Sequence, residues 1–247
     1  MSFNIRMGLA QDGNNHWRHR KSLVLARITA FAPDLLGMQE CCDDEAQAGF
    51  LKQHLSRYEF YGVQRGGNRG ASMEMAPALF KKSSFKVLEQ GCFWLSKTPE
   101  ISGSLNWDAA FSRTCLWFRL EHRETARELI YLNTHFDYQP IAMTESAEVL
   151  LAWLGKNADT PLIVTGDFNA DKQSEPYCIL IKHLVDARPD DDNTFHDYGR
   201  IDTGYPIDWI LVSAHFKIKG SHIDYYHDHD VYPSDHYPLL ATLDWQS

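Results

Sequence analysis

Short apolar runs alternate along this chain with segments whose apolar residues recur at helical spacing, and this alternation limits the fold most strongly. Short buried strands interleaved with amphipathic helices favour an α/β or α+β architecture. The sequence has no internal repeat, no low-complexity tract and no linker long enough to divide it. We therefore expect one α/β (α+β) domain that spans residues 1–247.

The strand-like runs are short and apolar, and proline or glycine often stands beside them. The expected strands cover residues 2–7, 34–40, 76–80, 86–95, 114–120, 128–134, 161–166, 207–212 and 239–244. The expected helices cover residues 17–31, 45–57, about 141–154 and 175–184. Pro33 ends the first helix, and Ser174 is a natural N-cap for the last.

Composition leaves room for a sizeable core and excludes a membrane-spanning chain. Hydrophobic residues make up 44% and aromatic residues 13% of the sequence, yet no apolar run approaches the ~20 residues needed to cross a bilayer. The N-terminus lacks the layout of a signal peptide. The five cysteines are odd in number and form no CxxC pair, which indicates reduced thiols in a cytoplasmic protein. A secreted protein that has lost its signal is the alternative.

The net charge of −9 and the pI near 5.7 limit the kind of partner. A protein that binds along nucleic acid through phosphate contacts is usually basic, whereas this chain is acidic. An enzyme that grips one phosphate through a divalent cation is compatible with this charge, because the cation reverses the local sign.

Acids, amides and imidazoles stand where the apolar runs begin or end. The positions are Asn4, Glu40, Asn133, His135, Asp167, Asn169, Asp208, Asp235 and His236. Singly, each has a structural interpretation: Asp167 or Asn169 as a turn former, or Glu40 as a helix cap. Asp208 could likewise pair with a surface lysine. Because the strands of one sheet end along one rim, where ligands of α/β proteins collect, the whole set favours a functional site.

The residue types in this set suit metal-assisted attack on phosphorus. Glu40, Asp235 and the Asn4 amide offer the oxygen ligands that Mg²⁺ or Mn²⁺ prefers. Donors for phosphate oxygens are provided by His135, His236 and Asn169. Asp208 could fix the tautomer of His236, whose other nitrogen would then take a proton from water.

The loop that carries Asp235 and His236 is bracketed by Pro233 and Pro238. Proline fixes φ and removes a donor, so this loop is expected to be rigid and non-helical. A nearby run, His227-Asp228-His229-Asp230, also looks like a metal cluster. Adjacent ligands in an acidic loop are more often solvated, and we favour that interpretation.

Six motifs of the chain resemble, in order, those of the endonuclease/exonuclease/phosphatase superfamily, the DNase I-like metal-dependent phosphohydrolases. The motifs are Ser-Phe-Asn-Ile-Arg, Gly-Met-Gln-Glu, Asn-Thr-His-Phe-Asp, Thr-Gly-Asp-Phe-Asn-Ala, Ile-Asp-Trp-Ile-Leu-Val and Pro-Ser-Asp-His-Tyr-Pro, between residues 2 and 238. The resemblance implies a four-layer α/β sandwich of two packed mixed β-sheets flanked by helices. Residues 92–100 and 107–110 are similar to a generic bacterial branch.

The resemblance also implies roles. Glu40 would be the principal metal ligand, with Asn4 and Asp235 as further residues of the metal shell. Asp167 and Asn169 would orient the nucleophilic water and the phosphate. His236, held by Asp208, would be the general base or a phosphate donor. His135 would stabilise the pentacovalent transition state or protonate the leaving oxygen, and which histidine acts as acid stays open.

Two weaker matches concern residues 71–74 and 111–113, which are similar to segments of DNase I. They imply that Glu74 is a partner for His135 and that Arg113 contacts the substrate phosphate. The alternatives are a loop carboxylate and a surface arginine. His135 stands where abasic-site endonucleases carry tyrosine, which disfavours DNA repair. Cys41 follows Glu40 where DNase I places an arginine, which weakens a duplex-nuclease interpretation.

We therefore expect a Mg²⁺- or Mn²⁺-dependent hydrolase of phosphoester bonds, either a phosphodiesterase or nuclease or a phosphatase. The alternatives are a phosphomonoesterase on a small sugar or inositol phosphate, and a non-catalytic binding module. The expected partner is a small phosphoester, or short nucleic acid because of the basic loop with Arg65 and Arg69. We expect a monomer without membrane insertion.

Overall fold

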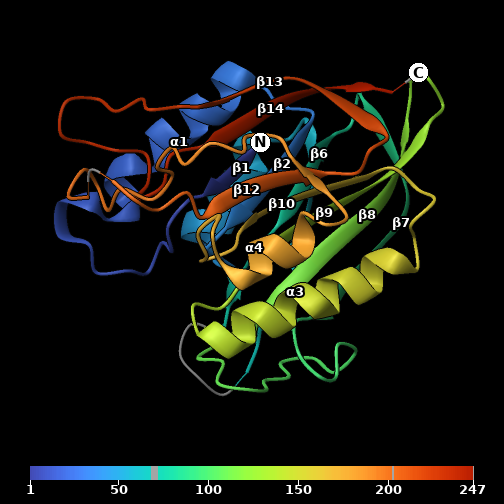
Figure 1. Ribbon diagram of the computed structural model, residues 1–247. Coiled ribbons are helices and arrows are strands. Elements are labelled where there is room, and N and C mark those ends of the chain that lie inside the picture. The colour runs from blue at the N-terminus through green and yellow to red at the C-terminus, as the bar shows by residue number, and fades with distance from the viewer. Residues whose placement is uncertain (68–71, 202, 247) are drawn as a thin grey trace.

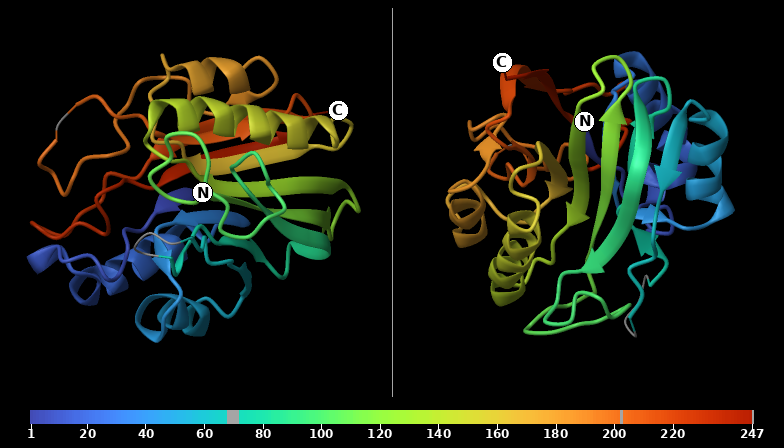
Figure 2. Two further views of the ribbon diagram at one scale, coloured as in Figure 1. Left: turned by 90° about the horizontal axis from the view of Figure 1, so that it is seen from below. Right: turned by 90° about the vertical axis from the view of Figure 1, so that its right-hand side faces the viewer.

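The computed structural model describes residues 1–67, 72–201 and 203–246, and its two large sheets face each other (Figures 1 and 2). The first sheet has the order β13 (Phe216–Ile223), β14 (Leu239–Trp245), β1 (Ser2–Asn4), β2 (Leu35–Gln39), β6 (Ala78–Lys81) and β4 (Tyr58–Tyr61). The second has the order β11 (Val185–Asp186), β12 (Asp208–Val212), β10 (Leu162–Asp167), β9 (Glu128–His135), β8 (Thr114–His122) and β7 (Phe85–Trp94). A small ladder pairs β3 (Cys41–Cys42) with β5 (Glu74–Met75).

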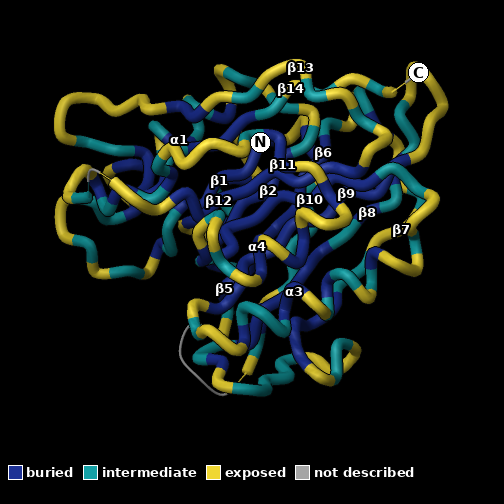
Figure 3. The backbone as a smooth tube through the Cα atoms, viewed as in Figure 1, coloured by how far each residue is buried: buried dark blue, intermediate teal, exposed yellow. Residues whose placement is uncertain are grey.

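Both large sheets are mixed. Strands β1 and β2 run parallel, as do β9 and β10, whereas β1 with β14 and β10 with β12 are antiparallel. The central strands are dark blue in Figure 3 because they are buried on both faces. Their near-continuous apolar runs reflect this burial.

Helices cover the outer face of each sheet. Helix α1 (Trp17–Phe31), a π-helical turn at Glu45–Gly49 and α2 (Phe50–His54) lie outside the first sheet. Helices α3 (Pro140–Gly155) and α4 (Glu175–Leu180) lie outside the second sheet. In the right-hand view of Figure 2, the blue and yellow helices lie on opposite sides of the strands. This arrangement confirms the expected four-layer sandwich.

The two sheets are joined at their centre by a buried polar network. Gln39 Nε2 donates to Asn133 Oδ1 at 2.8 Å, and Thr165 Oγ1 donates to the same oxygen at 2.9 Å. Asn133 Nδ2 in turn donates to the carbonyl oxygen of Met38 at 2.8 Å. Only glycine fits at position 37, because an added Cβ would lie 2.1 Å from Asn133 Oδ1. The network therefore fixes the spacing of the sheets directly beside Glu40.

Most of the expected elements are present, and the differences have physical reasons. The first strand ends at Asn4 and not at Met7, because Arg6 has a left-handed backbone with φ 55°. The helices expected over 45–57 and 175–184 end earlier, at His54 and Leu180. The sequence did not predict β4 and β13. Both are edge strands, and their charged and polar residues interrupt the apolar pattern.

All five cysteines are free in the structure. Within the described parts of the chain, no helix combines the length and apolar character that crossing a membrane requires.

Candidate active site

Three neighbouring strands of the second sheet end in polar side chains at the same level. The register pairs Asp167 of β10 with His135 of β9 on one side and with Asp208 of β12 on the other. All three residues are buried. The expected convergence of strand ends on one rim therefore occurs here.

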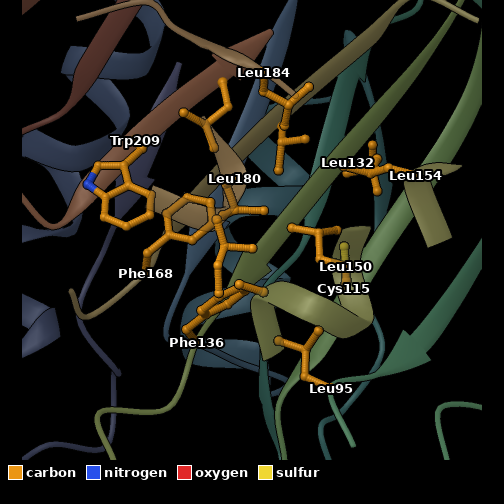
Figure 4. Close-up of a cluster of buried hydrophobic side chains, with 14 of the residues drawn as sticks. Leu95, Cys115, Leu132, Phe136, Leu150, Leu154, Phe168, Leu180, Leu184 and Trp209 are labelled. Atoms are coloured by element: carbon orange, nitrogen blue, oxygen red, sulfur yellow. The ribbon is translucent and has the colours of Figure 1, made fainter. Parts of the chain in front are cut away.

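An aromatic stack holds these strand ends in place from the opposite face of the sheet. The residue after each of the three polar residues is aromatic: Phe136, Phe168 and Trp209. Successive side chains of a strand point to opposite faces, so these rings enter the core beneath the helices. Phe168 stacks on Trp209 with a ring separation of 4.3 Å and contacts Phe136 edge-on at 4.8 Å (Figure 4). Core packing thus fixes the backbone under the polar rim.

The first sheet contributes Asn4 and Glu40 to the same rim. Asn4 Nδ2 donates to Asp167 Oδ2 at 2.8 Å and to Glu40 Oε1 at 3.1 Å, so one amide joins residues from both sheets. Glu40 has a left-handed backbone with φ 58°, which turns the chain sharply after β2. Asn4 Oδ1 accepts from the Arg6 amide at 2.9 Å. In this conformation Asn4 therefore orients the carboxylates through its nitrogen, instead of presenting its oxygen to a cation.

One cluster of side chains has the donor set of a small divalent cation. Single ligand atoms of Glu40, His135 and Asp167 all lie within 4.8 Å of one another. Two carboxylates at this spacing fit the oxygen preference of Mg²⁺ or Mn²⁺, and Mn²⁺ also accepts imidazole. Burial raises the pKa of Asp167, but His135 and His236 outweigh it, so the net shift is downward and the group is ionised.

Asp235 lies beside this cluster and is connected to it by an arginine that the sequence analysis did not single out. Asp235 is buried, and its Oδ1 accepts from Ser234 Oγ at 3.1 Å. Arg6 Nη1 lies 3.6 Å from Glu40 Oε2, and Arg6 Nε lies 3.6 Å from Asp235 Oδ2. Asp12 holds the same guanidinium through two hydrogen bonds of 3.0 Å. The only signal for Arg6 was its place two residues after Asn4, inside the first motif.

His236 forms a buried pair with Asp208. His236 Nδ1 and Asp208 Oδ2 are 2.8 Å apart, which directs Nε2 toward Asp167 Oδ2 at 3.7 Å. Burial lowers the pKa of His236, but Asp208, Asp167 and Asp235 together outweigh it and raise the pKa to about 10. The expected pairing of these two residues is therefore present, and it favours a protonated imidazole at neutral pH.

His135 is held from both sides of its ring. Arg113 Nη1 lies 2.9 Å from Nδ1, and Asn169 Nδ2 lies 3.1 Å from Nε2. Glu74 Oε1 is farther from Nδ1, at 3.4 Å. The arginine and the Asn169 amide nitrogen are both donors, so each ring nitrogen of His135 faces a hydrogen-bond donor, and Nε2 also lies 3.5 Å from Asp167 Oδ2.

Glu74 and Arg113 form a buried ion pair behind His135. Glu74 Oε1 accepts from Arg113 Nη1 at 2.8 Å, and Arg65 Nε lies 3.5 Å from Glu74 Oε2. Burial raises the pKa of Glu74, yet Arg113, His135 and Arg65 lower it to about 2. Glu74 thus lies where a partner of His135 was expected. Arg113 contacts both the Glu74 carboxylate and the His135 ring, and the arginine is only 6% exposed.

Two other sequence features lie apart from these clusters. Residues 227–230 are all exposed, and His229 pairs with its neighbour Asp228 at 2.8 Å. Among the described residues, this run is not one of the groups whose ligand atoms converge. Arg65 of the basic loop is buried against Glu74 and the Phe111 ring, and Arg69 lies outside the described residues.

The backbone beneath the rim depends on further residues that sequence reasoning missed. Thr194 Oγ1 accepts from the amides of Ile207 and Asp208, each at 3.1 Å. Arg20 of α1 donates to the carbonyl oxygens of Ile5 and Arg6. No signal in the sequence distinguishes these residues from others of their type, because their roles depend on backbone groups far away in the chain.

Comparison with known proteins places this geometry in a family. Residues 1–236 match the model of the Endonuclease/Exonuclease/phosphatase family. A crystal structure of an endonuclease/exonuclease/phosphatase from Bacteroides vulgatus is 31% identical, with a TM-score of 0.92 over 99% of this chain and 97% of that chain. A mannosyl-6-phosphatase from Bacteroides thetaiotaomicron is 26% identical, with a TM-score of 0.87 over 99% of this chain and 98% of that chain.

Curated relatives are more distant and longer. Protein angel of Drosophila melanogaster is 23% identical over 223 residues, which are 83% of this chain and 60% of that protein. An uncharacterized protein of Acanthamoeba polyphaga mimivirus is 27% identical over 168 residues, 63% of this chain and 60% of that protein. The chain thus spans about 60% of the length of these relatives. The motifs, the two-sheet architecture and the matched family model together show that the chain belongs to the endonuclease/exonuclease/phosphatase family.

Proposed function

We propose that this family member hydrolyses phosphoester bonds with the help of Mg²⁺ or Mn²⁺, as a single monomeric domain. The observation that carries the proposal is the convergence of both sheets on Asp167. Its Oδ2 lies within 3.7 Å of Asn4 Nδ2, His135 Nε2 and His236 Nε2. Such a set of buried acids and imidazoles on one rim suits reaction at a single phosphorus atom.

A cation at this rim would be held first by Glu40, whose ligand atom converges with those of His135 and Asp167. Asp235 would complete its shell, and Asn4 keeps the Glu40 carboxylate in place. When bound, the cation supplies a Lewis acid that neutralises phosphate charge and lowers the pKa of water. The Arg6 guanidinium between the two acids keeps their orientation defined, since it lies 3.6 Å from each carboxylate.

The remaining groups would handle water and protons. Asp167 and Asn169 would orient the attacking water, because the Asp167 carboxylate is ionised and accepts from the Asn169 backbone amide at 3.0 Å. Since the raised pKa keeps His236 protonated, we assign it as a donor to a phosphate oxygen rather than as the base. His135 would stabilise the transition state or protonate the leaving oxygen, because its Nε2 lies at the rim, 3.5 Å from Asp167 Oδ2.

The favoured substrates are small phosphoesters. The net charge of −9 opposes long nucleic acids, and Arg65, the described arginine of the basic loop, is buried beside Glu74. The likeness to the Bacteroides mannosyl-6-phosphatase over almost the whole of both chains supports a phosphomonoesterase acting on a phosphorylated sugar. Short nucleic acid is the competing substrate class.

Hydrolysis of p-nitrophenyl phosphate and of its bis ester, with added Mn²⁺ and with EDTA, tests the proposal. We expect activity only with the metal, and a loss of about 10²–10⁴-fold in His236→Gln. His229→Gln is the matched control, because that histidine has a side chain that is 94% exposed. Full activity in EDTA, or an unaffected His236→Gln variant, would refute the mechanism. A panel of sugar phosphates and short oligonucleotides then separates the two substrate classes.

A further inference from the structure

Arg20 is a fully buried arginine whose guanidinium donates hydrogen bonds to backbone carbonyl groups and lies over the Trp17 ring, 5.3 Å from its centre. Its Nη1 donates to the carbonyl oxygens of Ile5 at 2.5 Å and Pro233 at 3.0 Å. Its Nη2 donates to the Arg6 carbonyl at 2.8 Å, and its Nε to the Asn15 carbonyl at 2.8 Å. The residue is 0% exposed. One side chain of α1 thus contacts three separate segments of the chain.

Two of these segments carry the Asn4 amide and the Asp235 carboxylate of the proposed cation site. Ile5 and Arg6 directly follow Asn4, and Pro233 lies two residues before Asp235. The segments come from opposite ends of the chain, yet both carbonyls bind the same nitrogen atom of Arg20. Figure 1 shows α1 beside β1, where these contacts form. Arg20 therefore ties the end of β1 to the loop that carries Asp235.

The contact with Arg6 also stabilises an uncommon backbone conformation. Arg6 has φ 55°, a region that residues other than glycine rarely adopt. Its carbonyl accepts from Arg20 and from Gln47 Nε2 at 2.9 Å, and its amide donates to Asn4 Oδ1. These bonds fix where the Arg6 side chain points, toward Glu40 and Asp235. Backbone strain of this kind persists only where the surroundings over-determine it.

Charge gives Arg20 a second link to the site. Burial disfavours its charged form and lowers the pKa of Arg20, whereas Tyr198, followed by Asp235, Asp12 and Glu40, acts in the opposite direction. The guanidinium donates to four carbonyl oxygens and lies over the Trp17 ring, and the acids of the rim act on its charge through space. A lysine has the same charge but lacks the planar fork that reaches several carbonyls at once.

We propose that Arg20 is a positioning residue that sets the cation affinity of the site by holding the Asn4–Arg6 segment against the Asp235 loop. The inference rests on the proposed function, because it assumes that a divalent cation binds between these segments. In this role, Arg20 does not contact the substrate. It predicts that the geometry of the fork matters and that positive charge alone is not sufficient.

Binding of Mn²⁺ to the metal-free protein, measured by electron paramagnetic resonance, tests this without reference to activity. We expect Arg20→Lys and Arg20→Met to raise the Kd for Mn²⁺ by about 10–100-fold, as supporting residues of metal sites typically do. At saturating Mn²⁺, kcat of Arg20→Lys should recover to within about threefold of the wild type. Arg18→Met is the matched control, because Arg18 is an exposed arginine of the same helix.

The outcomes separate this inference from the proposed function. A wild-type protein that binds no Mn²⁺ contradicts the proposed function. A wild type that binds Mn²⁺, together with an Arg20→Lys variant of equal affinity, overturns the role of Arg20 alone. If the Arg20 variants do not fold, hydrogen exchange of the wild type decides. Mn²⁺ should then increase protection in residues 4–8 and 232–236 together, and protection of one segment without the other overturns the inference.

Discussion

Replacing Gly37 with alanine should strongly destabilise the protein, because this glycine lies where the two sheets come closest. The new Cβ would lie 2.1 Å from Asn133 Oδ1 and 2.2 Å from Thr165 Oγ1. An ordinary contact would require each oxygen to move by more than 1 Å, whereas the protein interior is close-packed. Both atoms are held by the network that includes Gln39, so movement of either one breaks hydrogen bonds.

The expected cost has two parts. Overpacking of a filled core typically costs about 1–3 kcal/mol. Separating Asn133 from its partners leaves buried polar groups unsatisfied, at about 1–3 kcal/mol each. We therefore expect Gly37→Ala to lower the free energy of unfolding by about 3–6 kcal/mol, a large share of the ~5–15 kcal/mol that stabilises a typical protein. At about 2–4 °C per kcal/mol, Tm should fall by roughly 6–24 °C.

Urea denaturation followed by tryptophan fluorescence measures this change. Gly220→Ala is the control, since an added Cβ there meets nothing within 4 Å, and its stability should stay within about 0.5 kcal/mol of the wild type. A Gly37→Ala variant within about 1 kcal/mol of the wild type would refute the reasoning. It would mean that the sheets can separate without loss, and that the spacing beside Glu40 is not fixed by the network.

Three further changes test other parts of the structure. Asp208→Asn keeps the shape of the partner of His236 but removes the charge, so kcat should fall about 10²–10⁴-fold in steady-state assays; a fall of less than about tenfold contradicts the pairing. The folded-state pKa of Glu74 is depressed to about 2 from 4.5, so its ionisation contributes about 3 kcal/mol of stability above pH 5. This contribution is lost as pH falls toward 2. The difference in the free energy of unfolding between the wild type and Glu74→Gln, measured with urea, should therefore become smaller as pH falls. A stability difference that does not change with pH would contradict the depressed pKa of Glu74. Phe168→Ala removes the middle ring of the aromatic stack and should cost about 3–5 kcal/mol by thermal unfolding, whereas a cost below about 1 kcal/mol would mean that the stack does not hold the strand ends.

The α/β class and the convergence of the strand ends followed from local patterns in the sequence, whereas the four-layer sandwich followed from the resemblance of six motifs to a known family. Apolar runs that end in Glu40, His135 and Asp167 define buried strands, and strands of one sheet must end along one rim. The adjacent pair Asp208-Trp209 shows the same alternation, with a polar group on one face and a core residue on the other. Such short-range signals can be recognised in the sequence because they depend only on the type and position of residues within one strand.

The parts that the sequence did not predict depend on contacts between distant residues. Arg20 looks like any helix arginine until its partners, from Ile5 to Pro233, are known. The contacts of Arg113 with Glu74 and His135 likewise could not be predicted, because only the tertiary structure sets the direction of a long side chain. The edge strand β13 lacks a continuous apolar run, since its exposed face must stay polar.

Anomalous diffraction from crystals soaked in Mn²⁺ tests the central claim most directly, namely that the strand ends around Asp167 form a cation-dependent phosphoesterase site. The account predicts a strong Mn²⁺ peak within coordination distance of the Glu40 carboxylate, on the rim shared with Asp235, and loss of that peak in Glu40→Gln. Mn²⁺ bound only at exposed acids such as Asp228, with the Glu40 rim empty, would contradict it.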